Sequence, residues 1–91
     1  MPLPDKVRLS MKVRTPVRVG DILMSFDDNG YFIVPANPTQ HKHICIGIAT
    51  EAIPEGAIIE WDVTQRQGFI SGRRVIVGMM GANDGVHIVS R

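Results

Sequence analysis

The stretch VRVGDIL at residues 17–23 decides the fold, because the chain repeats the same pattern as IPEGAII at residues 53–59. Each copy contains a turn glycine that leads into a short aliphatic run. Each is followed, after a gap, by a glycine and an aromatic residue, at Gly30-Tyr31 and at Gly68-Phe69. The copies lie 36 residues apart at the first glycine and 38 at the second. A turn glycine before a short strand, used twice, is typical of a compact β domain.

The rest of the chain consists of short apolar runs separated by turn residues. Asp27-Asp28-Asn29-Gly30 predicts a tight hairpin turn, because Asn-Gly readily adopts the positive φ angles that such turns require. No window shows the i, i+3, i+4, i+7 apolar spacing of an amphipathic helix. The sequence therefore predicts an all-β domain, a small β-sandwich or β-barrel. The expected strands are residues 6–14, 22–26, 31–34, 43–50, 57–63, 69–70, 73–80 and 86–89.

Length and composition narrow the class of protein. A chain of 91 residues fits one domain. Its single cysteine excludes an intrachain disulfide, so we expect oligomerisation to supply further stability. The longest apolar runs are too short to span a membrane, and residues 1–5 lack the basic and apolar regions of a signal peptide. The protein is therefore expected to be made in the cytoplasm.

Charge is distributed unevenly along the chain. Residues 1–18 carry a net charge of +4, residues 19–66 carry −5 and residues 67–91 carry +2. We therefore divide the chain into an N-terminal arm or strand at 1–16 and one β domain at 17–91. From residue 6 to 14 apolar and polar residues alternate, which predicts a half-buried strand in the domain or a strand that pairs with another molecule.

One set of residues has the spacing of a metal site. His41, His43 and Cys45 would project from the same face of a strand, and imidazole and thiolate are ligands that zinc prefers. The simpler interpretation is a small core cysteine beside polar histidines, because cysteine is often buried and inert. We therefore expect no metal or cofactor, and a metal-binding accessory domain stays an alternative. No nucleophile elbow occurs, so we expect a protein without enzymatic activity.

The basic leader raises the alternative of a small nucleic-acid-binding β-barrel. Five cations within residues 6–18 would attract phosphate. However, the body of the chain is acidic, and its few aromatic residues lie among aliphatic ones, as core residues do. Proteins that bind single strands instead present several aromatic side chains on a basic face. The composition therefore favours a protein partner.

A family resemblance supports a protein partner. After Gly20-Asp21 the chain reads IGIA at residues 46–49 and EAIPEGAIIE at residues 51–60. In these motifs residues 15–63 resemble the small capsid decoration, or cement, proteins of tailed phages, which are similar to lambda-type head-stabilising proteins with a β-tulip domain. The resemblance implies a homotrimer on the outer surface of the virion, bound to the major capsid protein.

The resemblance also implies an extended N-terminal arm that adds to strands of the capsid. The apolar side chains of the arm would be covered by the shell, and its cations would meet acidic patches. The residues expected to bind the capsid in this way are Lys6, Val7, Arg8, Leu9, Met11, Lys12, Val13 and Arg14.

Overall fold

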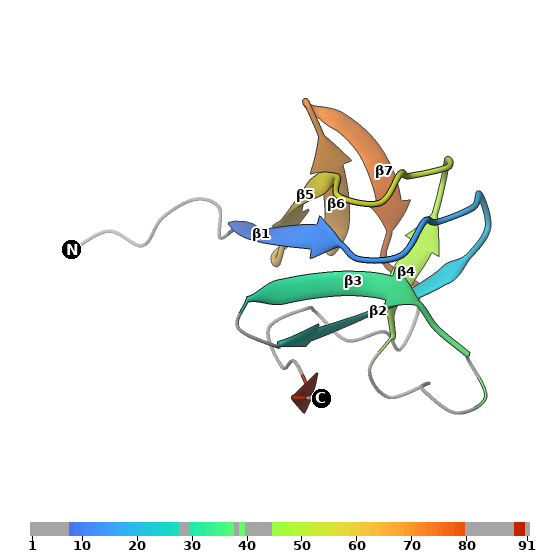
Figure 1. Cartoon of the computed structure of the whole chain (residues 1–91). Helices are drawn as coiled ribbons and strands as arrows, with labels where there is room; N and C mark the ends of the chain where they lie inside the picture. The colour runs from blue at the N-terminus through green and yellow to red at the C-terminus, as the bar shows by residue number, and fades with distance from the viewer. Residues whose placement is uncertain (1–7, 28–29, 38, 40–44, 80–88, 91) are drawn as a thin grey trace.

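The computed structural model describes residues 8–27, 30–37, 39, 45–79 and 89–90 (Figure 1). These residues form eight β-strands and no helix. The strands are β1 (Arg8–Val13), β2 (Ile22–Asp27), β3 (Tyr31–Pro35), β4 (Cys45–Ala49), β5 (Ile58–Asp62), β6 (Gln67–Ile70), β7 (Arg73–Val77) and β8 (Val89–Ser90). The prediction of an all-β domain is confirmed.

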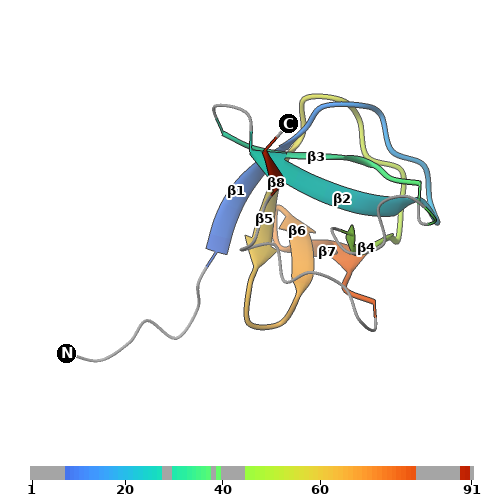
Figure 2. The same cartoon turned by 90° about the horizontal axis from the view of Figure 1, so that it is seen from below.

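Seven of the strands close into a barrel. Their order is β3-β1-β5-β6-β7-β4-β2, and antiparallel pairing of β2 with β3 completes the circle. Strand β8 pairs in parallel with the end of β2. The β2–β3 hairpin forms one side of the barrel, and β5, β6 and β7 form the other (Figure 2). Because each of the seven strands is paired on both sides, the fold is a closed barrel and not an open sandwich.

The repeated pattern forms the centre of an internal pseudo-two-fold. Val17 and Ile53 exchange two backbone hydrogen bonds, each with an N···O distance of 2.9 Å. Three residues after each of them lies a turn glycine, Gly20 or Gly56, and both have a φ of 87°. The two copies thus adopt the same turn and pack against each other.

Strand pairing on either side of this centre follows the same 36-residue offset. In the β1–β5 pair, Met11 lies opposite Ile59. In the β4–β2 pair, Gly47 lies opposite Leu23. Gly47 is the equivalent of Met11 and Leu23 is the equivalent of Ile59, so the two pairs have the same register. The first strand of each copy therefore pairs with the hairpin of the other copy.

Strand β7 breaks the symmetry. In the first copy β3 lies directly beside β1, with Val13 opposite Ile33. In the second copy β7 lies beside β4, with Ala49 opposite Ile76, and β7 separates β4 from β6. This inserted strand raises the barrel from six strands to seven.

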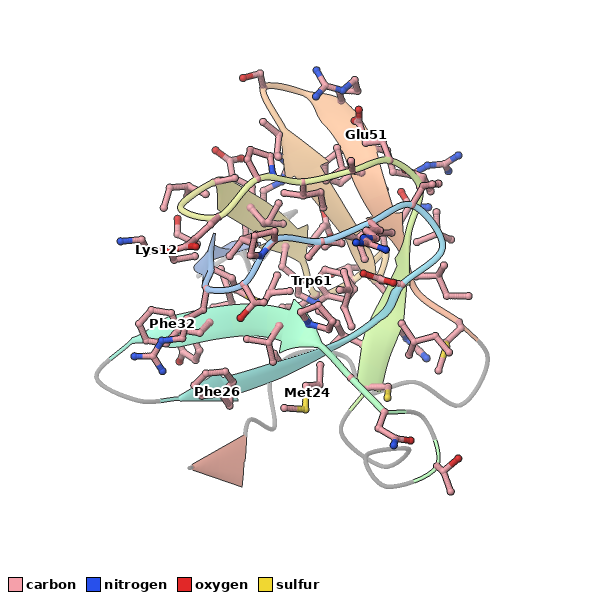
Figure 3. The ribbon with its side chains drawn as sticks, turned by 45° about the vertical axis from the view of Figure 1, so that its right-hand side comes forward. Lys12, Met24, Phe26, Phe32, Glu51 and Trp61 are labelled. Carbon is pink, nitrogen blue, oxygen red and sulfur yellow. The ribbon has the colours of Figure 1, made fainter. Side chains whose placement is uncertain are left out.

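A hydrophobic core fills the barrel. Trp61 is its largest fully buried side chain and projects inward in Figure 3. Both copies contribute, because the core contains Met11, Val13, Val17, Leu23, Ile33, Ile46, Ala49, Ile53, Ile59, Trp61, Val75 and Ile76. Closure of the barrel thus buries the apolar faces of strands from both copies together.

Strand β1 belongs to this barrel. Met11 and Val13 are fully buried, and Leu9 packs against the core while Ser10 and Lys12 are exposed. The half-buried strand expected from the alternation is confirmed. The structure places residues 8–13 between β3 and β5, and not in an arm outside the domain. Residues 1–7 lie outside the described residues.

Candidate binding site

An open pocket of about 470 Å³ lies where the end of β1, strand β3 and the turn before β5 meet. This volume falls within the range of small-ligand pockets. The lining combines two cations, one carboxylate and one aromatic ring with a valine and a glycine. The lining residues are Lys12, Val13, Arg14, Phe32, Glu55 and Gly56.

The strand alternation of β1 positions the two cations. Val13 points into the core and is fully buried, so its neighbours Lys12 and Arg14 project outward and are exposed. Lys12 lies opposite Ile58 of β5 on one side and opposite Phe32 of β3 on the other. Both cations therefore project from the outer face of the barrel, and Lys12 lies between two apolar side chains.

The turn at residues 54–57 brings the carboxylate to the pocket. Gly56 donates its backbone N–H to the carbonyl oxygen of Val13 at 2.8 Å, which holds the turn against the end of β1. The φ of 87° at Gly56 is a conformation that other residues rarely adopt. A Cβ at this position would meet no atom within 4 Å, so the backbone and not crowding requires the glycine. Glu55, next to it, lines the pocket and is exposed.

Two stacked rings hold the guanidinium of Arg14. Its Cζ lies 4.5 Å from the ring centroid of Phe32 and 5.5 Å from that of Phe26. The two rings are themselves stacked, with centroids 5.6 Å apart. Figure 3 shows both rings and Lys12 on the same side of the molecule. Contact with aromatic faces restricts the guanidinium and places its charge at one point of the pocket.

Arg8, by contrast, forms ion pairs with carboxylates of the barrel. Its Nη1 lies 3.1 Å from Oε2 of Glu60, and its Nε lies 3.7 Å from Oδ2 of the fully buried Asp62. Its guanidinium also covers the ring of Phe69 at 5.0 Å. Neither Lys12 nor Glu55 forms an ion pair with a described residue. Lys12 is therefore the cation of β1 whose charge no described carboxylate neutralises.

The structure gives different places to the residues expected to bind the capsid. Met11 and Val13 lie in the core, so the expectation that a partner covers them is wrong. Lys12 and Arg14 come together in the pocket, whereas Arg8 pairs with carboxylates of β5 and Leu9 packs against the core. Lys6 and Val7 lie outside the described residues.

The expected metal-site residues are only partly described. Cys45 is fully buried at the start of β4, and burial raises the pKa of its thiol. A buried, protonated thiol is a poor metal ligand and a poor nucleophile. His41 and His43 lie outside the described residues. Among the residues that the structure does describe, no three histidine, cysteine, aspartate or glutamate side chains gather as a metal site would require.

The sequence did not single out Phe32 or Glu55 as site residues. The aromatic residues are expected in the core, but Phe32 is only half-buried and lines the pocket. The available signal for Glu55 was its place beside the turn glycine of the second copy. The repeat alone could not show that this turn folds against β1.

Comparison with known proteins adds no relative. No family model matches the chain, and searches of curated proteins and of solved structures find no match. Within the described part of the chain, no helix is long and apolar enough to cross a membrane.

Proposed function

We propose that this chain is a non-enzymatic decoration protein that binds the outer surface of a phage head and stabilises contacts between major capsid protein subunits. The observation that carries the proposal is the mixed cationic and apolar surface around the pocket, which we call the pocket face. It consists of Lys12, Arg14, Phe32, Glu55 and Ile58.

The composition of the pocket favours binding over chemistry. Its lining offers one carboxylate, Glu55, and contains no histidine, cysteine, serine or threonine. General acid–base catalysis usually employs histidine or groups with shifted pKa values, and covalent catalysis needs an activated nucleophile. Two cations beside apolar side chains provide recognition instead.

The exposed apolar side chains favour a protein partner. Ile58 is 53% exposed and lies directly opposite Lys12 on the outer face of the barrel. A partner that covered this pair would bury the isoleucine and approach the cation at the same time. Protein interfaces combine an apolar centre with charged groups that set orientation.

We also propose that the protein forms a homo-oligomer, a trimer in the resemblance. A barrel of this size buries a small core, and a second apolar surface is exposed at Val19 and Ile48. Val19 is 68% exposed. Packing of these side chains between copies would add apolar burial. Sedimentation equilibrium tests this, with Val19→Asp as the variant expected to dissociate the oligomer.

The direct test looks for a major capsid protein encoded beside this chain and assembles shells from it. The purified protein is expected to co-sediment with expanded shells, to saturate at a fixed ratio to capsomers and to raise the temperature at which the shells dissociate. The variant Ile58→Asp keeps the barrel core unchanged and is expected to reduce binding strongly. The variant Arg74→Ala, which changes an exposed cation of β7, serves as the control.

Two results would contradict this function. The first is a folded protein that fails to co-sediment with expanded shells. The second is tight binding to DNA whose affinity falls steeply with salt, because that dependence marks phosphate contacts.

A further inference from the structure

The two copies in the barrel differ most clearly at the pocket face. At the positions 36 residues from Lys12 and Arg14 lie Ile48 and Thr50. At the position equivalent to Glu55 lies Val19. The backbone framework is shared, because Gly20 donates to Ala49 as Gly56 donates to Val13. The fold therefore does not require charged side chains here.

One cation near the second copy's equivalent surface is neutralised by a carboxylate. Arg73 of β7 donates from Nε to Oε1 of Glu51 at 2.6 Å. At the pocket face, by contrast, Lys12 forms no ion pair with a described residue, and two rings hold Arg14 in place. The pocket face thus carries two cations at positions where the equivalent surface carries Ile48 and Thr50. A carboxylate supplied by a partner would complement these cations.

The charge and shape of the pocket select the kind of anion. Glu55 in the lining would repel a chain of phosphodiesters more than it would repel one carboxylate. Arg14 lies over the ring of Phe32, which obstructs the stacking of a base there. The exposed Ile58 beside Lys12 provides a contact for an aliphatic side chain. These features favour an acidic segment of a protein over a nucleic acid.

We propose that the pocket face is a receptor for a short acidic peptide segment, in which one carboxylate binds between Lys12 and Arg14 and a neighbouring aliphatic side chain packs on Ile58. The segment belongs to the capsid partner, so this inference deepens the proposed function and rests on it for the identity of the partner. The recognition chemistry can be tested without a capsid.

The first experiment uses two synthetic peptides, each acetylated and amidated. One has the sequence Ala-Asp-Leu-Asp-Ala and the other has the sequence Ala-Asn-Leu-Asn-Ala. Amide shifts of the full chain are followed by NMR during titration. The acidic peptide is expected to shift the resonances of Lys12, Arg14 and Gly56, with a dissociation constant in the millimolar range. Equal shifts with both peptides, or no shift at these resonances, would overturn the inference.

Variants then assign the interaction to named side chains. Lys12→Ala removes an exposed cation and is expected to weaken binding of the acidic peptide about tenfold, as loss of a charge-assisted contact does. Arg74→Ala, with the same change in net charge, is expected to leave the affinity unchanged. If both variants lose the same affinity for the acidic peptide, the interaction depends on net charge alone and the inference is overturned.

Glu55→Gln provides a test that loss of folding cannot imitate. Removing this carboxylate is expected to strengthen binding of the acidic peptide by about threefold, because its repulsion of the incoming carboxylate disappears. Arg14→Lys keeps the charge but not the planar contact with the rings, and is expected to weaken binding. Unchanged affinity in Glu55→Gln would contradict the proposed position of the peptide carboxylate.

The two proposals fail separately. If shells bind Lys12→Ala as tightly as the original chain, the receptor inference fails while the decoration function stands. If the chain binds the acidic peptide at the pocket face but no shell, the function fails while the receptor stands. Displacement of the acidic peptide by a short DNA duplex at lower concentration would overturn the choice of a protein ligand.

Discussion

The two copies of the repeated unit share a backbone but divide its tasks. The first copy, residues 8–35, supplies the two cations and the ring of the pocket face, whereas the second copy, residues 45–70, supplies Glu55, Ile58 and the core residue Trp61 and packs against the inserted strand β7. Matching turn glycines and strand registers give the two copies the same backbone framework around the pseudo-two-fold. Side chains at equivalent positions can then differ in size, polarity and charge.

Among equivalent positions, Trp61 and Ser25 are expected to differ most in what their substitution costs in stability. Both residues are buried on equivalent strands, 36 residues apart. Trp61→Ala is expected to lower the free energy of unfolding by about 3–5 kcal/mol, which is most of the stability of a small domain.

Ser25→Ala, by contrast, is expected to change the free energy of unfolding by less than about 1 kcal/mol. Its Oγ is buried and has no hydrogen-bond partner among the described residues, so its removal leaves no group newly unsatisfied. Urea denaturation followed by tryptophan fluorescence measures Ser25→Ala, and circular dichroism measures both variants. Similar losses at the two sites would show that the copies share the core equally.

The next largest loss of stability is expected on substitution of Gly47, which is equivalent to Met11. A Cβ at Gly47 would overlap the backbone carbonyl oxygen of Val77, because β7 approaches β4 there. Gly47→Ala is expected to cost about 1–3 kcal/mol of stability by overpacking. Met11→Leu, which nearly conserves volume in the first copy, is expected to cost less than about 1.5 kcal/mol. A stability of Gly47→Ala equal to that of the original chain would argue against the close approach of β7.

The two turn glycines are expected to respond alike. Gly20 and Gly56 share a φ of 87°, and a Cβ at either would meet no atom within 4 Å. Alanine at either position should therefore cost about 1–2 kcal/mol, from backbone strain alone. Thermal denaturation of Gly20→Ala and Gly56→Ala measures both. If the two variants lose stability by amounts that differ by more than about 1 kcal/mol, the two turns are not equivalent.

The smallest expected effect is a loss of stability at alkaline pH, which comes from Cys45 in the second copy. Burial raises the pKa of the Cys45 thiol, so the unfolded chain loses this proton at a lower pH than the folded chain does. The contribution to stability is present below the ordinary pKa of a thiol and is lost as pH rises through the folded pKa. The slope stays below about 1.4 kcal/mol per pH unit. Denaturation at alkaline pH should show this slope in the original chain and a reduced one in Cys45→Val.

Local patterns in the sequence predicted most of the strands. Alternation, apolar runs and turn glycines act over a few residues, and they located β2, β3 and β7 within a few residues of their observed bounds. The partners of the strands were not predictable in the same way. The parallel contact of β1 with β3 and the insertion of β7 beside β4 depend on how the whole barrel closes.

The candidate site was predictable only in part. The alternation identified Lys12 and Arg14 as outward-facing cations, and both lie in the pocket. It could not separate them from Arg8, because the carboxylates that neutralise Arg8 come from β5. Phe32 and Glu55 reach the cations only through pairing of β3 with β1 and folding of the turn against β1. Tertiary contacts therefore determine that Arg8 is neutralised within the barrel and that Lys12 forms no ion pair with a described residue.

The exchange of first strands between the two copies governs how this chain can fold. The contact of β1 with β5 joins Arg8 to Glu60, 52 residues away, and β4 must return to β2. Neither copy can complete its own set of hydrogen bonds, so we expect neither half of the chain to be stable alone. We expect slow, all-or-none folding, because closure of such long loops precedes most of the native contacts. During synthesis the apolar side chains of β1 cannot be buried against β5 until β5 has emerged from the ribosome.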